Sequence, residues 1–346
     1  MGFLFDLIKS LLWFFAIVYV AIPLLFYFLP AVSHTLIFMT AVKWPFANYS
    51  DPRTHGVKYE SRNFYLNVEP GIVLGCWQIL PKALYRRDQS SSRSEREFDE
   101  LLAQQGYPIV MYMHGNTWTR SAAHRVLLYN MLSELNLHVI AFDYRGFGDS
   151  TGMASEEGIN RDVQAMYRWI SERSGENPIL LWGHSLGTAI ATRLGQEVCH
   201  SDVRRPAGLV LEAPFNNLAE VVRHHPFTYM FRWLPWFEQT IVQPCAKNDL
   251  NFNTDLRIRH LCFPLLFLHA KDDRIIPFHL AKKLEQEAKD AGVDTTFIEF
   301  DHPHNYGHKY IINAPELPDV VYEFVQHCIS QDHVISSNAS LSSYRN

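Results

Sequence analysis

The middle of this chain reads Pro178-Ile179-Leu180-Leu181-Trp182-Gly183-His184-Ser185-Leu186-Gly187, an apolar run that leads directly into a Gly-x-Ser-x-Gly motif. A stretch of small, helix-forming residues, 188–196, follows at once. This order of strand, tight turn and helix is what a nucleophile elbow requires. The glycines are needed because the turn is strained and because the strand and the helix pass close to the serine. The pattern therefore predicts that the hydroxyl of Ser185 stands clear of a sheet, at the positive end of a helix.

A second Gly-x-Ser-x-Gly motif surrounds Ser150, at residues 148–152. Its apolar run, 139–142, ends well before the serine, and two residues separate the motif from Ser155, which has the sequence of a helix N-cap. The strand and the helix therefore do not meet at this serine. The context favours Ser185 as the nucleophile and predicts that Ser150 is an ordinary loop serine.

Composition and charge narrow the class of protein. The chain has 346 residues, of which 47% are hydrophobic and 19% are charged, as in a globular protein with a buried sheet. The net charge of −5 gives no reason to expect a nucleic-acid partner. No C-x-x-C pair occurs, so neither a zinc site nor a disulfide framework is indicated, and one disulfide remains compatible with an oxidising compartment. The five cysteines are scattered: Cys76, Cys199, Cys245, Cys262 and Cys328.

The N-terminus carries a long apolar run, with no charged residue between Ser10 and Val42. About 20 apolar residues span a bilayer. The run is longer than the core of a signal peptide and ends without a clear cleavage site, so a signal anchor is favoured over a cleaved signal, and Pro30 is expected to end it. We therefore predict a short N-terminal segment, a transmembrane anchor and a juxtamembrane segment, at residues 1–9, 10–32 and 33–60.

Beyond the anchor, strand and helix signals alternate, which indicates a mostly parallel sheet with helices on both faces. Residues 63–68 and 73–80 predict an opening hairpin, and residues 86–100, rich in charge and serine, predict a solvated loop. Further strands are expected at 109–113, 138–142, 179–182, 209–211, 265–268 and 296–300. We predict one catalytic domain over residues 61–330, followed by a polar, disordered tail over residues 331–346.

A serine nucleophile needs a base, and the base needs an acid that orients it. In the α/β-hydrolase fold the acid and then the histidine follow the serine, each at the end of a later strand. Asp272 and Asp273 both follow the strand expected at residues 265–268. The apolar residues 275–277 would pack back on the fold, which sets the spacing and favours Asp273 as the acid.

The base is harder to choose, because three histidines lie in the loop after the last expected strand: His302, His304 and His308. His308 stands immediately before the apparent last helix, whereas His304 is followed by an asparagine, as in the looser His-Asn signature of other hydrolases. Position alone leaves the choice open, with a slight preference for His308.

An oxyanion hole requires two backbone N–H groups that point at the developing charge. One is expected from Leu186, directly after the nucleophile. The other is expected from Asn116, in the loop that follows the strand at residues 109–113, where Gly115 permits a turn. His114 is expected to hold this loop.

Between residues 216 and 262 the chain leaves the alternation of strand and helix, as a lid inserted after the sixth strand would do. Aromatic side chains gather there, and they either pack the lid onto the body or form an acyl channel at the membrane surface. In the second reading Arg232 or Arg223 lies near an anionic head group. The candidates for this substrate region are Trp233, Trp236, Phe237 and Arg232.

Short segments spread over the chain carry a family resemblance: His114-Gly115-Asn116, Thr119-Arg120, His124-Arg125, Phe142-Asp143-Tyr144-Arg145-Gly146-Phe147-Gly148-Asp149-Ser150, Trp182-Gly183-His184-Ser185-Leu186-Gly187-Thr188, His225-Pro226-Phe227, Asp272-Asp273, Pro277-Phe278, His308-Lys309-Tyr310 and Pro315-Glu316-Leu317-Pro318. Together they resemble the membrane-anchored lysophosphatidylserine and monoacylglycerol lipases of the α/β-hydrolase domain-containing protein 12 type. The resemblance extends from the anchor to about Phe324. It implies Ser185, Asp273 and His308 as the triad, and a single-pass protein of the endoplasmic reticulum with a luminal catalytic domain.

Two sequence rules disagree about topology. The positive residues Lys43, Arg53, Lys58 and Arg62 follow the apolar run and only Lys9 precedes it, which by the positive-inside rule places the domain in the cytosol. Two glycosylation sequons, at Asn48 and Asn338, lie on the domain side of the run and favour the lumen. The resemblance also favours the lumen.

We therefore expect a membrane-anchored serine hydrolase that cleaves the fatty-acyl ester of a single-chain lipid, needs no metal or organic cofactor, and has the lipid and the bilayer as its partners. An acyl-protein thioesterase would use the same triad. A non-catalytic membrane scaffold that kept the fold would be expected to lack a member of the triad, and all three residue types are present. Nothing in the sequence sets the oligomeric state.

Overall fold

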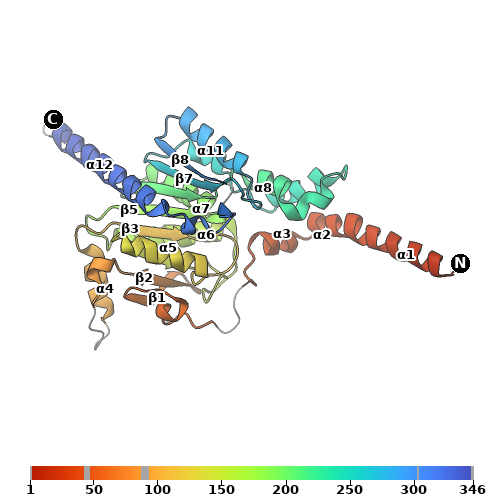
Figure 1. Cartoon of the computed structure of the whole chain (residues 1–346), viewed down its shortest axis with the longest axis horizontal. Helices are drawn as coiled ribbons and strands as arrows, with labels where there is room; N and C mark the ends of the chain where they lie inside the picture. The colour runs from red at the N-terminus through yellow and green to blue at the C-terminus, as the bar shows by residue number, and fades with distance from the viewer. Residues whose placement is uncertain (1, 43–46, 87–92, 302–303, 344–346) are drawn as a thin grey trace.

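An eight-stranded sheet lies at the centre of the computed structural model, which describes residues 2–42, 47–86, 93–301 and 304–343 (Figure 1). The strand order is β1-β2-β4-β3-β5-β6-β7-β8. The first two strands form an antiparallel hairpin, β2 pairs antiparallel with β4, and the remaining pairs are parallel. The strands are β1 (Ser61–Glu69), β2 (Ile72–Ile79), β3 (Ile109–Met113), β4 (His138–Phe142), β5 (Ile179–His184), β6 (Gly208–Glu212), β7 (Leu265–Ala270) and β8 (Thr295–Phe300). The predicted hairpin and parallel sheet are confirmed.

The central strands are short apolar runs because both faces of the sheet are covered by helices. Every residue of β3, β4, β5, β6 and β7 is buried. Alternate side chains enter two different cores: Leu181 belongs to the core on one face of the sheet, whereas Leu180 and Trp182 belong to the core on the other. The helices around the sheet include α5 (Ala123–Glu134), α6 (Glu156–Ser171), α7 (Leu186–Cys199) and α11 (Phe278–Asp290).

Two expectations about local structure were wrong. The segment 86–100 is not a loop throughout, because α4 (Glu95–Ala103) begins there; residues 87–92 lie outside the described residues. Ser94 and Glu97 form a capping box, and Phe98 is buried, so local caps and an apolar face outweigh the charged composition. Helix α12 (Leu317–Ser343) likewise continues through most of the tail for which we expected disorder, and the sequence after its first turn has no proline or glycine to stop it.

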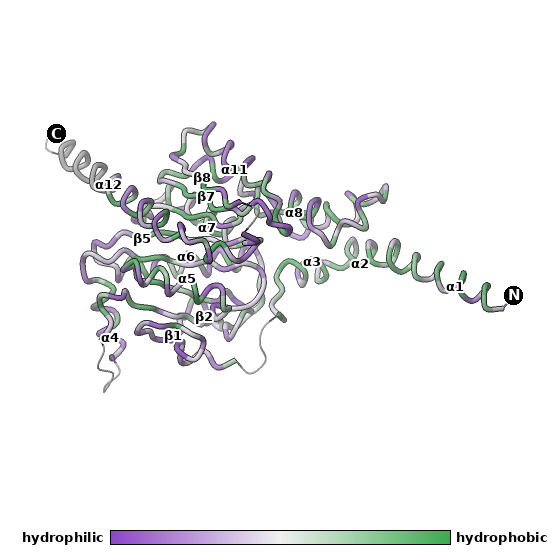
Figure 2. Tube along the Cα trace, in the orientation of Figure 1, coloured by the Kyte–Doolittle hydropathy of each residue, from purple (hydrophilic) through white to green (hydrophobic). Residues whose placement is uncertain are grey.

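The N-terminal apolar run forms one helical rod that projects from the domain, and its hydrophobic character is plain in Figure 2. It consists of α1 (Gly2–Ala16), a π-helical turn η1 (Ile17–Ala21) and α2 (Ile22–Phe28). The most apolar 18-residue window of this 27-residue helix has a mean hydropathy of 2.3, and the helix rises about 40 Å, enough to cross a hydrocarbon layer of about 30 Å. The helix starts earlier than the predicted anchor and ends just before Pro30, where Leu29 adopts extended backbone and α3 (Pro30–Ile37) begins.

Residues 216–262, called the insertion below, leave the sheet after β6 and return to it before β7. They form α8 (Leu218–His224), η4 (Pro226–Phe231), η5 (Glu238–Val242), α9 (Gln243–Lys247) and α10 (Thr254–Ile258). A disulfide joins Cys199, at the end of α7, to Cys262, where the insertion returns to the sheet. The single bridge that the cysteine pattern left open is therefore present.

Candidate active site

The motif around Ser185 forms a sharp turn between β5 and α7. Ser185 has φ 53° and ψ −118°, a strained backbone conformation for a residue with a side chain. A Cβ atom on Gly183 would collide with the backbone of Gly187, and one on Gly187 would collide with the carbonyl group of Met113. Both glycines are therefore required by close approach of the backbone. The predicted elbow is confirmed as a local structure.

The structure brings together the three side chains that were predicted as a triad. His308 Nε2 lies 2.9 Å from the Oγ of Ser185, and His308 Nδ1 lies 2.7 Å from Asp273 Oδ2. These side chains come from turns that follow β5, β7 and β8, at the carboxyl edge of the parallel sheet. The hydrogen-bonded order serine, histidine, acid is the geometry in which a histidine can accept a serine proton.

Asp273 is held in place as a carboxylate. Burial opposes its ionisation, but the charge and hydrogen bond of His308 outweigh this effect and hold the pKa of Asp273 below its usual range. Its other oxygen, Oδ1, accepts the N–H groups of Ile275 and Ile276 at 2.8 and 3.0 Å, the apolar residues that set the predicted spacing. Asp272 does not reach His308 directly; its Oδ1 accepts the N–H of Gly307 at 3.0 Å and so anchors the loop that carries the histidine.

The other candidate residues lie away from this relay. His304 is exposed and stacks on Tyr306 at 5.3 Å, and His302 lies outside the described residues. Ser150 is buried and structural: its hydroxyl donates to the carbonyl of Asp143 at 2.7 Å and accepts the N–H of Gly75 at 2.9 Å. The prediction that Ser150 is a loop serine therefore agrees with its contacts.

The two residues that were expected to supply the oxyanion hole, Leu186 and Asn116, lie beside Ser185. Leu186 is the first residue of α7, so its N–H has no acceptor within the helix. The loop after β3 passes directly next to Ser185, since a Cβ atom on Gly115 would lie 3.3 Å from the Cβ of Ser185. Asn116 follows. The carbonyl of Gly115, which shares a peptide with the N–H of Asn116, lies 2.7 Å from His114 Nδ1, and this contact fixes the orientation of that peptide. The carbonyl of Asn116 accepts the N–H of Met39 at 3.2 Å, which holds the next peptide.

Buried charged residues hold the same loop. The guanidinium of Arg125 donates to the carbonyls of Thr117 and Thr119 at 2.6 and 2.7 Å. His114 is buried, and burial lowers its pKa well below the ordinary value, so it is a neutral structural residue, as expected. Arg120 pairs with Asp143 at 2.5 Å beneath the loop.

Two residues at the site were missed by sequence reasoning. His184 Nε2 lies 2.8 Å from the carbonyl of His308, so the residue before Ser185 holds the backbone of His308. Glu212 ends β6; its carbonyl accepts the N–H of Ser185 at 2.9 Å, and its Oε2 accepts Trp182 Nε1 at 3.0 Å. Burial raises the pKa of Glu212 to about 7. The sequence signal that could have indicated Glu212 is a carboxyl group at the end of the expected strand after the elbow.

The insertion carries one residue, His225, whose ionisation is influenced by the charge of His308. Burial lowers the pKa of His225, and the charge of His308 contributes to this shift, so the two imidazoles lie within electrostatic reach. Of the predicted substrate residues, Trp233 and Trp236 are exposed, whereas Phe237 is buried in the core. Arg232 donates to the carbonyl of His225 at 3.0 Å and lies over the ring of Tyr229. Arg223 instead pairs with two acids, Glu220 and Glu238.

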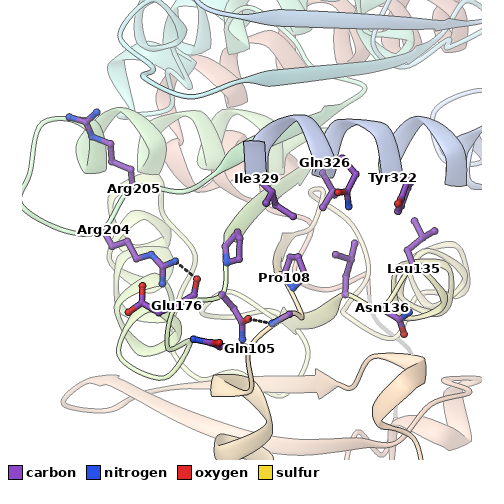
Figure 3. A pocket seen from close by; sticks show the side chains of 15 residues that line it. Gln105, Pro108, Leu135, Asn136, Glu176, Arg204, Arg205, Tyr322, Gln326 and Ile329 are labelled. Atoms are coloured by element: carbon purple, nitrogen blue, oxygen red, sulfur yellow. Dashed lines mark hydrogen bonds between the residues drawn. The ribbon is translucent and has the colours of Figure 1, made fainter. Parts of the chain in front are cut away.

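A groove of about 1020 Å³, whose lining residues are drawn in Figure 3, lies at another edge of the sheet. Its lining includes Pro108, Leu137 and Pro178, which precede β3, β4 and β5, and side chains of α12 cover it. Ser185 lies at the opposite, carboxyl end of β5, and the groove contains no member of the hydrogen-bonded triad. Within the described residues, no cluster of three His, Cys, Asp or Glu side chains is arranged to hold a metal ion.

The strand order and the elbow define an α/β-hydrolase, a class of serine hydrolases. A sequence profile described as Serine aminopeptidase, S33, matches residues 105–253. The fold is shared with an α/β-hydrolase from Vibrio vulnificus, with a TM-score of 0.62 and 18% identity over 86% of this chain and 92% of that one. An esterase from Pyrococcus furiosus gives a TM-score of 0.55 and 19% identity over 82% of this chain and 94% of that one.

Closer relatives are found by sequence. Lysophosphatidylserine lipase ABHD12 of Danio rerio is 38% identical over 330 residues, which cover 94% of this chain and 85% of that protein. Lysophosphatidylserine lipase ABHD12 of Xenopus tropicalis is 39% identical over 312 residues, which cover 89% of this chain and 80% of that protein. The chain therefore belongs to the ABHD12 family, and the predicted family and the prediction of an ester hydrolase are confirmed.

Proposed function

We propose that this chain is a membrane-anchored lipase that cleaves the fatty-acyl ester of single-chain lipids, with Ser185, His308 and Asp273 as its catalytic triad. The observation that carries the proposal is the hydrogen-bond relay from Ser185 through His308 to Asp273, with separations of 2.9 and 2.7 Å. The names of the relatives support lysophosphatidylserine as a substrate, and the chemistry extends to other lysophospholipids and monoacylglycerol.

The mechanism follows from the positions of these groups. Ser185 attacks the acyl carbonyl while His308 Nε2 takes its proton, and the ionised Asp273 orients the imidazole and stabilises its charged form. The N–H groups of Asn116 and Leu186 stabilise the tetrahedral oxyanion. His308 then gives the proton to the departing alcohol oxygen, which leaves an acyl-enzyme. Water activated by the same histidine releases the fatty acid and restores the serine.

Four variants test the proposed triad against its nearest alternatives. Ser185→Ala should abolish labelling by a fluorophosphonate and hydrolysis of lysophosphatidylserine, whereas Ser150→Ala should leave the labelling intact. His308→Ala should lower kcat by orders of magnitude, and His304→Ala should change it little. Labelling that survives in Ser185→Ala and disappears in Ser150→Ala would show that the nucleophile is misassigned.

We further propose that the protein resides in the membrane of the endoplasmic reticulum with its catalytic domain in the lumen. The Cys199–Cys262 disulfide supports this side, because disulfides persist in oxidising compartments and are rare in the cytosol. Asn48 is exposed, as a glycosylated asparagine must be, and Asn338 falls in the last part of α12, whose side chains lie outside the described residues.

Glycan removal tests this topology. Digestion of the expressed protein with endoglycosidase H should shift its mobility, and the variants Asn48→Gln and Asn338→Gln should identify which sequon carries the glycan. A protein without any shift, whose domain is digested by protease added to intact microsomes, would instead have its catalytic domain in the cytosol.

A further inference from the structure

One end of the insertion presents a group of large apolar side chains to its surroundings. Five side chains between residues 227 and 236 are exposed, by fractions from 41% to 77%. We call them the insertion tip: Phe227, Tyr229, Met230, Trp233 and Trp236. An exposed apolar cluster of this kind marks a contact with another apolar surface.

The tip lies beside the N-terminal helix (Figure 1). The ring of Tyr19, within the π-helical turn, lies 5.1 Å from that of Trp233 and 6.2 Å from that of Phe231. Val18, Tyr19, Ile22 and Pro23 are partly or fully covered, and they share one face of the helix. Phe26, three residues after Pro23 on the same face, is also partly covered, and the other residues of the rod are exposed. The helix therefore uses one face for the insertion and leaves the others free.

The contacts between the two segments change in character along the helix. Tyr27 lies eight residues after Tyr19 on the N-terminal helix. The ammonium of Lys247, from the insertion, lies 5.0 Å from the centre of its ring. Beyond the break at Leu29 the contacts are polar: Asn248 Nδ2 donates to the hydroxyl of Ser33 at 2.9 Å. Along the helix, contacts between aromatic rings are followed by a contact between a cation and a ring, and then by a hydrogen bond. Contacts change in the same order from the interior of a hydrocarbon layer to its interface with water.

The depth of each contact in the hydrocarbon layer follows from its distance along the helix from Lys9. The last charged residue before the apolar run is Lys9, and a hydrocarbon layer of about 30 Å takes about 20 residues, which ends near Leu29. Tyr19 is ten residues after Lys9, or about 15 Å along the helix, close to the middle of the layer. Tyr27 lies about 12 Å further on, close to the edge.

We infer that the insertion tip is immersed in the leaflet nearest the catalytic domain and packs there on the anchor, so that lipid covers its exposed side chains. This inference rests on the anchor spanning the membrane, as in the proposed function. Two arginines near the tip have partners within the protein: Arg232 lies over the ring of Tyr229, and Arg223 pairs with Glu238.

The cysteines of the chain permit a direct measurement of depth. Cys76, Cys245 and Cys328 are buried, and Cys199 and Cys262 are bonded to each other, so a nitroxide reagent will label a new surface cysteine selectively. We would label full-length protein in phosphatidylcholine vesicles at one position at a time and compare nitroxide collisions with oxygen, which concentrates in hydrocarbon, and with a nickel chelate, which stays in water. The variants are Tyr229→Cys and Trp233→Cys in the tip, Lys247→Cys at the expected edge, Trp13→Cys in the anchor and Met153→Cys on the catalytic domain.

The expected oxygen-to-nickel collision ratio is high at Tyr229, Trp233 and Trp13, intermediate at Lys247 and low at Met153, which is 87% exposed. Fluorophosphonate labelling identifies the variants that fold, and the two tip positions serve as replicates of each other.

Each alternative outcome has a separate meaning. A high ratio at Trp13 with a low ratio at both tip positions overturns the inference and leaves the anchor in place. Low ratios at Trp13 and at the tip overturn both the inference and the proposed anchor. Shielding of the tip from both reagents, with dipolar broadening between nitroxides, shows that a second copy of the chain covers it and overturns immersion in lipid.

Discussion

Glu212 offers a test of the site through the pH dependence of stability. The carboxyl group is buried beside the elbow, and burial raises its pKa from 4.5 to about 7. A raised pKa means that the folded state favours the protonated form. The stabilisation is therefore complete below about pH 4.5 and is lost as the pH rises through 7. The difference between the two pKa values corresponds to a loss on the order of 3 kcal/mol.

Glu212→Gln should remove most of this loss, because glutamine is neutral at every pH and can still accept the N–H of Trp182. The midpoint of thermal unfolding, measured in detergent micelles from pH 4.5 to 8.5, should fall with pH in the wild type by several degrees more than in the variant. The variant should be the more stable protein at pH 8.

Glu285→Gln is a control with the opposite sign. Glu285 is buried, but Lys282 and Lys289 lie 2.7 and 2.6 Å away, and together they outweigh burial and lower its pKa. Its contribution is present at neutral pH and is lost as the pH falls through the lowered pKa, so this variant should lose stability at pH 7 and lose less in acid. If Glu212→Gln and the wild type show the same slope between pH 5 and 8, Glu212 does not titrate there and the argument from burial is refuted.

Three further changes have defined outcomes. Asp273→Asn should lower kcat on a soluble ester by about 10³–10⁴, with thermal unfolding little changed, because histidine loses the partner that fixes its tautomer. Trp233→Ala combined with Trp236→Ala should reduce turnover of a long-chain lysophospholipid more than that of a short soluble ester; equal losses would remove the argument for a substrate role of the insertion. Replacing Cys199 and Cys262 together by serine should lower the free energy of unfolding by up to about 4 kcal/mol, since the bridge closes a loop of 63 residues, and a reducing agent should destabilise only the wild type.

The sequence was most informative where the physical cause is local. The elbow could be predicted because its glycines, its preceding strand and its following helix are all adjacent to Ser185. The buried strands could be predicted because a strand covered on both faces is a short apolar run, as in β5 and β7. Asp273 could be preferred to Asp272 because the two N–H groups that orient it belong to the next few residues.

The choice of histidine shows the limit of local reasoning. His308 meets Ser185 across 123 residues of sequence, and nothing in the loop itself states which of its histidines makes that contact. The deciding contacts come from elsewhere in the chain: Asp272 holds the N–H of Gly307, and His184 holds the carbonyl of His308. Position alone gave His308 a slight preference, and the resemblance to a known family strengthened it. The helix at Glu95–Ala103 is a different case, because the capping box of Ser94 and Glu97 is visible in the sequence and predicts a helix despite the charged composition.

The relation between the anchor and the insertion could not be predicted, because the apolar run is hydrophobic on every face and its partner lies about 210 residues away. A bilayer needs only that the helix be apolar, whereas packing against the insertion needs Val18, Tyr19, Ile22 and Pro23 on one side. The insertion is also held at its return to the sheet, where the disulfide ties Cys262 to the end of the elbow helix. An element held by the anchor at one end and by the elbow helix at the other cannot swing as a free flap.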